Sequence, residues 1–229
     1  MPPIQRTVHA VYSALADCYG RPDATHPSGT PLNVLVETIL SQHTSDKNSH
    51  RAFLALRRAF PRWEQVLAAP VQQVAHAIRS GGLANQKAPR IQAVLQEILQ
   101  REGRLSLARL RRLSTEEIYT YLISLPGVGD KTACCVLLFA LNRPAMPVDT
   151  HIHRIIRRLG WVSPKASVTA VRVLLESRLP PAALYHMHVL LIAHGRQSCV
   201  AQRPRCSTCP IRARCAYARS AKTASFGRR

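Results

Sequence analysis

The stretch that decides the predicted fold is 125–154, LPGVGDKTACCVLLFALNRPAMPVDTHIHR. It opens on a Leu-Pro-Gly-Val-Gly turn at 125–129, in which two glycines around one apolar residue permit a tight connection between helices. An apolar segment follows at 130–141, and Asp149 then precedes apolar residues at helical spacing, which is typical of an N-cap. The stretch therefore predicts two helices, each introduced by its own turn or cap.

The same helical spacing recurs along the rest of the chain. Apolar residues from Ile91 to Leu99 fall at i, i+3, i+4, i+7 and i+8, which predicts one buried helix face, and Gly103 is expected to end that helix. No stretch alternates apolar and polar residues for long enough to predict a strand. The predicted fold class is therefore all-α. Further helices are expected over 5–19, 70–79, 130–141, 150–159, 166–178 and 181–194.

Capping signals predict where three more helices begin. Thr30 before a proline is a typical helix start, and Ser114 with Glu117 forms the pattern of a capping box. Asp46 is predicted to cap a helix that ends near Pro61. Each assignment rests on a side-chain oxygen that can accept a hydrogen bond from the unpaired N–H groups of a first helical turn.

The charge balance indicates a polyanionic partner. Lysine and arginine number 32 against 12 aspartates and glutamates, which gives a formal net charge of +20 and a pI near 10.9. Nucleic acid is the usual partner of such an excess, with an anionic membrane second. Residues 218–229, ARSAKTASFGRR, form a basic tail that we expect to be mobile. Because no apolar run is long enough to span a membrane and the N-terminus lacks a signal core, we expect an intracellular protein, in the cytoplasm or at the nucleoid.

Lysine is the rarer cation, at five positions against 27 for arginine, so a lysine here can mark a place that needs an amine. Lys131 lies at a predicted helix start, where the helix dipole disfavours an ammonium and so favours a nucleophilic amine. The alternative role for Lys131 is a contact to DNA phosphate. Capping explains Asp149 completely, and the 125–129 turn either binds a phosphate through its backbone or simply connects two helices.

Four cysteines near the C-terminus have the spacing C-x6-C-x2-C-x5-C, at Cys199, Cys206, Cys209 and Cys215. Four thiolates in so short a loop can close around one metal centre, either a structural zinc or a [4Fe–4S] cluster. A single x2 step between longer ones favours the cluster, because zinc sites usually combine two short knuckles. The three remaining cysteines, Cys18, Cys134 and Cys135, are predicted to have no metal role, the last two as small core residues.

At this point the sequence resembles a known family. The stretch 125–154 resembles the helix–hairpin–helix and Gly/Pro-Asp motif of the DNA glycosylase superfamily. The cysteine loop, preceded by His-Gly-Arg at 194–196, resembles the iron–sulfur loop of endonuclease III. Residues 40–46 (LSQHTSD) and 82–88 (GLANQKA) also resemble segments of that enzyme, in the same order. The resemblance covers roughly residues 30–217.

The resemblance implies a role for several residues. Lys131 matches the catalytic amine and Asp149 the motif aspartate, while 125–129 matches a hairpin that grips phosphate, with a bound monovalent cation. His43 would fill the gap left by a flipped nucleotide, and Leu83 would wedge into the opposite strand. The DNA contacts implied are Gln42, His43, Leu83, Asn85, Leu125, Gly127, Val128, Gly129 and His151. His43 in place of glutamine, and Ala84 in place of a bulky tyrosine, leave the lesion range and opposite-base preference open.

The implied protein is a monomeric, bifunctional DNA glycosylase and abasic-site lyase of base excision repair. It would remove oxidised pyrimidines of the thymine-glycol type from duplex DNA, act on abasic sites, and cleave the strand by β-elimination. Its architecture would be two helical domains with a DNA-binding cleft between them: a helical barrel at 24–143, and 1–23 with 144–229 around one [4Fe–4S] cluster. The alternatives are an adenine mismatch glycosylase, which generally lacks the lysine, and a non-catalytic helix–hairpin–helix DNA-binding protein with a structural metal.

Overall fold

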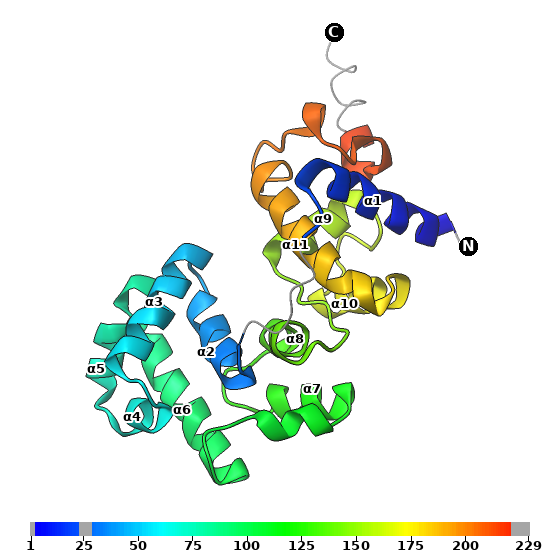
Figure 1. Cartoon of the computed structure of the whole chain (residues 1–229). Helices are drawn as coiled ribbons and strands as arrows, with labels where there is room; N and C mark the ends of the chain where they lie inside the picture. The colour runs from blue at the N-terminus through cyan, green and yellow to red at the C-terminus, as the bar shows by residue number, and fades with distance from the viewer. Residues whose placement is uncertain (1–2, 23–28, 221–229) are drawn as a thin grey trace. The chain divides into compact units, whose positions relative to one another are not determined.

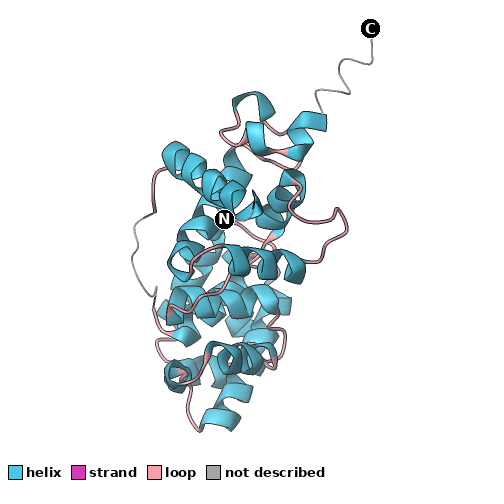
Figure 2. Ribbon diagram, turned by 90° about the vertical axis from the view of Figure 1, so that its right-hand side faces the viewer, coloured by secondary structure: helices cyan, strands magenta, loops and turns pink. Residues whose placement is uncertain are grey.

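The computed structural model describes residues 3–22 and 29–220 (Figure 1). Every regular element in these ranges is helical and none is a strand, which confirms the all-α prediction (Figure 2). Beyond Ser220, the basic tail expected at 218–229 lies outside the described residues. Over the same two ranges, no helix combines the length and apolar character that crossing a membrane requires.

The chain divides into two compact units, of which unit 1 is Met1–Thr25 with Pro144–Arg229 and unit 2 is His26–Arg143. Unit 1 contains α1 (Pro3–Tyr19), α9 (Thr150–Leu159), α10 (Val168–Arg178), α11 (Pro181–Gln197), η4 (Cys206–Thr208) and η5 (Arg212–Arg214). Unit 2 contains α2 (Pro31–Ser41), α3 (Asp46–Ala59), α4 (Trp63–Ala68), α5 (Val71–Ala77), η1 (Arg79–Gly81), α6 (Ala84–Glu102), η2 (Ala108–Arg112), α7 (Thr115–Ile123), α8 (Asp130–Cys135) and η3 (Val136–Ala140).

Most capping signals act where the sequence places them. The Thr30 hydroxyl accepts from the Asn33 N–H at the start of α2, and Ser114 and Glu117 form the reciprocal capping box of α7. Gly103 ends α6 in the left-handed conformation, with φ of 68°. The prediction that Asp46 is an N-cap is wrong by one residue. The Ser45 hydroxyl caps α3, and Asp46 is the first helical residue, where a carboxylate still favours the dipole.

The apolar helix predicted at 130–141 changes its winding halfway. It is α-helical as α8 and then continues as the π-helical turn η3, in which the Leu141 N–H reaches back to the Val136 carbonyl. Cys134 and Cys135 are buried in α8, in agreement with the prediction that they are core residues. The wider turn brings the chain to Arg143, whose N–H bonds the Leu137 carbonyl and whose guanidinium bonds the Arg111 and Leu113 carbonyls.

The core of unit 2 is built around α2, which packs against α3, α6 and α8. Fully buried leucine and isoleucine side chains join these helices, each worth about 1.5–3 kcal/mol when removed from water. They include Leu35, Ile39, Leu56, Ile91, Leu95 and Ile98. The apolar stripe predicted from 91 to 99 is therefore the face that α6 turns inward.

Unit 1 is assembled on α11, which packs against α1, α9 and α10. Polar groups tie its segments together. The buried His188 imidazole on α11 bonds the Pro147 carbonyl at 3.0 Å, and the Glu176 carboxylate on α10 accepts from the Met146 N–H at 2.9 Å. Both bonds hold the buried segment that leads into α9.

Candidate nucleic-acid interface and cysteine loop

The hairpin between α7 and α8 is anchored by its apolar residues and presents its glycines. Leu125 and Val128 are buried, whereas Gly127 and Gly129 are exposed. The Val128 N–H bonds the Leu125 carbonyl at 3.2 Å, which closes the turn. Gly127 has φ of +71°, a conformation that L side chains rarely adopt. The exposed backbone of this turn is therefore held in one shape and is accessible to a ligand.

Arg90 on α6 joins this hairpin to the end of α2. A Cβ atom at Gly127 would lie 2.7 Å from the Arg90 Cδ, so the arginine side chain lies directly over the glycine. The Arg90 guanidinium donates to the Gln42 side-chain oxygen at 2.8 Å. Sequence analysis missed Arg90, although it follows Leu83 by seven residues and so shares a helix face with it.

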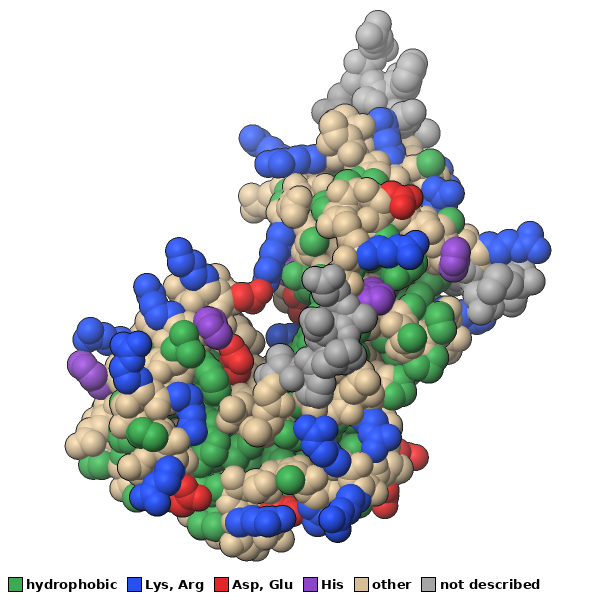
Figure 3. Space-filling model, viewed as in Figure 1, with side chains coloured by type: hydrophobic (Ala, Val, Ile, Leu, Met, Phe, Trp, Pro, Cys, Tyr) green, Lys and Arg blue, Asp and Glu red, His purple; other side chains and the backbone are tan. Residues whose placement is uncertain are grey.

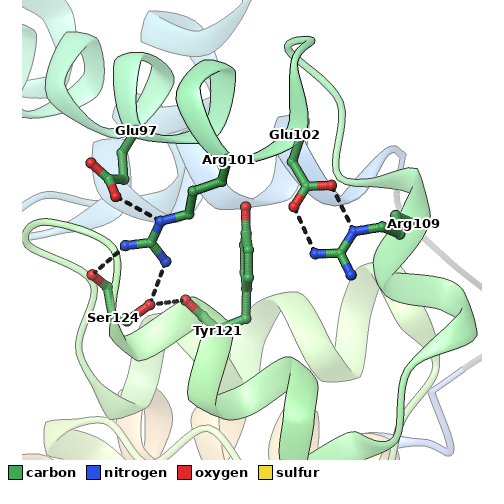
Figure 4. Close-up of polar contacts among 6 residues, drawn as sticks. All are labelled: Glu97, Arg101, Glu102, Arg109, Tyr121 and Ser124. Atoms are coloured by element: carbon green, nitrogen blue, oxygen red, sulfur yellow. Dashed lines mark hydrogen bonds and ion pairs between the residues drawn. The ribbon is translucent and has the colours of Figure 1, made fainter.

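The other side of the hairpin is held by a polar cluster between α6 and α7 (Figure 4). Arg101 is paired with Glu97 at 2.6 Å and donates to the Ser124 hydroxyl at 2.6 Å, directly before Leu125. The neighbouring Glu102–Arg109 pair forms two bonds of 2.8 Å, and the Arg109 bond lowers the pKa of Glu102. Between them Tyr121 has its pKa raised to about 12, mainly by burial.

Three non-glycine residues of unit 2 are in the left-handed conformation, namely His43, Leu83 and Asn142. The first two lie in loops at 42–43 and 82–83, which we call the two probing loops. His43 has φ of 54° and Leu83 has φ of 50°. Each such residue costs about 1–3 kcal/mol and persists only where its surroundings hold it. His43 is exposed and Leu83, a large apolar side chain, is 46% exposed. Strained, exposed residues of this kind are typical of ligand-binding positions.

A groove of about 600 Å³ lies beside Leu83. One wall is α5, with Gln72 and His76, followed by Arg79 of η1, and the other is the start of α6. The predicted DNA-binding residue Asn85 lines it, together with Ala84, whose small side chain leaves this space open. The departure noted at Ala84 thus has a direct structural consequence.

Lys131 is the second residue of α8, immediately after the hairpin. Lys131 is half-buried, and the next two residues of α8, Thr132 and Ala133, are buried in the core. Among the described residues of unit 2, its ammonium has no hydrogen-bond or ion-pair partner. The neighbouring Asp130 carboxylate is engaged elsewhere, because it accepts from the Tyr119 hydroxyl at 2.7 Å. No ion pair therefore joins the amine to the acid next to it.

Asp149 caps α9 in unit 1, as the sequence predicts. Its Oδ1 accepts from the Ile152 N–H at 2.8 Å. His151, the second residue of α9, packs against Gly195 of α11, where an added Cβ would lie 2.7 Å from the His151 Cβ. Arg154 donates to His151 Nδ1 at 3.0 Å and to the Gly195 carbonyl at 3.1 Å. The orientation of His151 is thus set by α11.

The four predicted ligand cysteines line a single pocket in unit 1. The apolar side chains of Ile155, Leu159 and Ile211 share its wall. Burial raises the pKa values of Cys209 and Cys215, and the other cysteines of the loop add to both shifts. Within the described ranges, no three Cys, His, Asp or Glu side chains converge on one point that could hold a single metal ion.

Two arginines one turn apart on α9 hold this cysteine loop. Arg158 donates to the Cys199 sulfur at 3.3 Å and to the carbonyls of Val200 and Ala201 at 2.7 and 2.8 Å. Arg154 donates to the Cys199 carbonyl at 3.0 Å. Sequence analysis missed both arginines, although their i, i+4 spacing ahead of the cysteines was visible.

His194 supports the loop from α11. Its Nε2 lies 3.8 Å from the Cys209 sulfur, and its Nδ1 bonds the Tyr19 hydroxyl at 2.9 Å. The Tyr19 hydroxyl also bonds the Ser198 hydroxyl at 2.8 Å, and burial raises the pKa of Tyr19. Burial lowers the pKa of His194 to about 4, so this imidazole is neutral at physiological pH.

The surface of both units is strongly basic. In the face that Figure 3 shows, Lys and Arg side chains are spread over each unit with few Asp and Glu among them. The formal net charge of +20 makes this excess a property of the whole chain. Such a surface binds phosphate backbones through charge without reading sequence.

The sequence that forms these features matches a known protein family. The sequence model of the HhH-GPD superfamily of base excision DNA repair proteins matches residues 36–181, which include the hairpin, Lys131 and Asp149. The chain belongs to this superfamily.

Sequence comparison also finds individual proteins that are similar to this chain. Endonuclease III of Thermotoga maritima is 33% identical over 194 residues, which are 85% of this chain and 86% of that protein. An Arabidopsis thaliana relative is 42% identical over 165 residues, which are 72% of this chain and 56% of that protein. A rice relative is 31% identical, and this chain spans 13% of its length.

Solved structures show the same likeness. A trapped covalent intermediate of endonuclease III with DNA is similar with a TM-score of 0.81 at 29% identity, over 95% of this chain and 98% of that one. A non-covalent endonuclease III–DNA complex has the same TM-score at 28% identity.

The left-handed conformation of Gly127 predicts that replacing this glycine destabilises the hairpin. Gly127→Ala forces an alanine into the left-handed conformation, while the exposed Arg90 side chain can move aside, so it should lower the free energy of unfolding by about 1–3 kcal/mol in urea titrations. The matched control is Gly129→Ala, because a Cβ there meets no atom within 4 Å. It should change that free energy by less than about 0.5 kcal/mol. Equal losses in both variants would contradict the role given to the left-handed backbone of Gly127, because Gly129 has φ of −103°.

Proposed function

We propose that the chain is a bifunctional DNA glycosylase and abasic-site lyase that removes oxidised pyrimidines, of the thymine-glycol type, from duplex DNA. The observation that carries this proposal is Lys131, an amine that no ion pair joins to its neighbouring acid, placed directly behind an anchored hairpin. Membership of a base excision repair superfamily supports the reaction class. In this proposal 24–143 is the catalytic barrel domain, 1–23 with 144–229 is the cluster domain, and the enzyme works at genomic DNA in the nucleoid.

DNA would be held by backbone contacts and opened by the two probing loops. The hairpin would bind phosphate through the N–H groups of its exposed turn, with a monovalent cation at its carbonyls. A damaged base cannot be attacked inside the stack, so it must flip out, which costs a few kcal/mol. His43 and Leu83 would fill the space left behind and offset part of that cost.

The chemistry would run through Lys131 and Asp149. The neutral amine attacks the sugar C1′ while the bond between C1′ and the base breaks, and the base leaves with the bonding electron pair and takes up a proton. Asp149 stabilises the positive charge that develops at C1′ and assists deprotonation of Lys131. The sugar ring then opens as the C1′–O4′ bond breaks and O4′ takes up a proton, which leaves a Schiff base between C1′ and Lys131. This Schiff base acidifies the C2′ proton, whose loss expels the 3′ phosphate and breaks the strand.

We further propose that Cys199, Cys206, Cys209 and Cys215 hold one [4Fe–4S] cluster. The donor set fits, because four cysteine side chains line one pocket together with the apolar Ile155, Leu159 and Ile211, and Arg158, which also lines it, donates to the Cys199 sulfur. The cluster would supply a rigid cross-link for a loop that has only the short turns η4 and η5.

The first test concerns the nucleophile. Lys131→Gln should abolish both strand cleavage of thymine-glycol duplex and the covalent adduct trapped by borohydride, because only an amine gives a reducible Schiff base. Lys165→Gln, which removes the same charge from an exposed loop of unit 1, is the matched control and should keep both. Trapping by the Lys131 variant would refute its role. If the wild-type protein released the base without cleaving the strand, a monofunctional glycosylase would be favoured. If it bound the DNA and did neither, a non-catalytic DNA-binding scaffold would be favoured.

A second test separates capping from catalysis at Asp149. Asparagine also caps helices, so Asp149→Asn should change the free energy of unfolding by less than about 0.5 kcal/mol. Single-turnover base release should nevertheless fall by at least about 100-fold, since an amide cannot stabilise a cation or take up a proton. Normal turnover in this variant would reduce Asp149 to a structural cap.

A third test concerns the cluster. Natively purified protein should contain about four iron atoms per chain, and Cys206→Ala should lose them. Cys18→Ala, an exposed cysteine away from the loop, should retain the iron. One zinc atom and no iron in elemental analysis would contradict the cluster.

A further inference from the structure

Lys87 is a buried lysine whose position the sequence did not single out. Its side chain lies on α6 and the residue is 2% exposed. The ammonium donates to the Leu40 carbonyl at 2.6 Å and to the Gly81 carbonyl at 2.8 Å. Burial, and then the nearby Arg90, lower its pKa. Among the described residues of unit 2 no carboxylate pairs with it, so backbone carbonyls alone hold the charge.

The two carbonyls belong to the turns that lead into the two probing loops. Leu40 is in the last turn of α2, two residues before Gln42, and the negative end of that helix favours a cation. Gly81 ends η1, two residues before Leu83. One ammonium therefore joins two segments that are some 40 residues apart in sequence but share a partner in space.

Both turns are also packed tightly where Lys87 holds them. A Cβ added at Gly81 would lie 3.0 Å from the Ala52 Cβ and 3.9 Å from the Leu40 carbonyl oxygen. His43 and Leu83, just beyond the turns, are both non-glycine residues in the left-handed conformation. Such conformations persist only when neighbouring structure holds them, and Lys87 supplies the shared restraint.

We infer that Lys87 is a positioning residue that holds the two probing loops as one body, so that discrimination of damaged from undamaged DNA depends on a side chain that does not touch DNA. The inference rests on the proposed function, which gives these loops their task. Loops already held in place lose little conformational entropy when DNA arrives, so the full contact energy is available to distinguish the opened site.

The test compares two variants of the same helix. Lys87→Met keeps an unbranched side chain of similar length and removes both donated bonds. Gln92→Met is the matched control, because Gln92 on α6 also donates to two backbone carbonyls at the end of a helix, those of Val66 at 2.9 Å and Ala69 at 2.8 Å at the end of α4, away from the probing loops. The measurement is the affinity for a duplex with an uncleavable abasic-site analogue divided by the affinity for the undamaged duplex.

Lys87→Met should lower this ratio by at least about tenfold and leave affinity for undamaged duplex within about twofold, since phosphate contacts are unchanged. Gln92→Met should leave the ratio within about twofold of the wild-type value, even if this variant loses as much thermal stability as Lys87→Met does. An unchanged ratio in Lys87→Met, or an equal loss in Gln92→Met, would overturn the inference.

If Lys87→Met does not fold, hydrogen exchange of the wild-type protein tests whether the two probing loops move as one body. The Gln42 N–H bonds the Ile39 carbonyl and the Gly82 N–H bonds the Arg79 carbonyl, so each probing loop has a protected amide. Loops held as one body should open together, with equal protection factors. Protection that differs by more than about tenfold would overturn the inference.

Failure of the proposed function would look different from failure of this inference. The abasic analogue needs no cleavage, so a wild-type protein that prefers it but cleaves no lesion duplex would refute the chemistry and leave the Lys87 comparison intact. A fully active wild type with an unchanged ratio in Lys87→Met would refute the inference alone.

Discussion

The buried face of α6 fixes the rotation of that helix, and the proposed DNA-binding surface of unit 2 depends on this one constraint. Ile91, Leu95 and Ile98 are fully buried, so a shift of the register by one residue, about 100° of rotation, would expose them. With the register set, the N-cap residue Leu83 emerges at one end. Lys87 faces the two probing loops and Arg90 covers the hairpin glycine.

In unit 1, helix α9 likewise positions several residues of the candidate site. The N-cap of α9 is Asp149, and two arginines further along the same helix hold the cysteine loop. The loop lacks long helices of its own, and its carbonyls bond these arginines. A cluster that rigidifies the loop would therefore also steady α9, and with it the carboxylate that caps that helix. This gives the proposed metal centre a mechanical link to the proposed catalytic carboxylate.

Local sequence signals predicted the helices well because capping and periodicity act within a few residues. Thr30, Ser114 and Asp149 each bond an N–H three residues ahead, and Gly103 ends its helix by its own conformation. Asp46 was misassigned because serine and aspartate, adjacent at 45 and 46, can both cap and only the backbone decides between them.

The contacts that organise the candidate site could not be predicted in the same way. Lys87 bonds a carbonyl 47 residues away, Arg90 bonds a side chain 48 residues away, and Arg154 bonds a carbonyl 45 residues away. No periodicity reports such pairs, since each depends on how helices pack. The rarity of lysine was the one available signal for Lys87, and it applied equally to five positions.

The measurement that tests the account most directly is the mass of the peptide that carries the borohydride-trapped DNA remnant after proteolysis. The account predicts one adduct, on Lys131, in the peptide that runs through the hairpin into α8. An adduct on any other lysine or on the chain's amino terminus, or no adduct with a lesion duplex that is nevertheless cleaved, would contradict it.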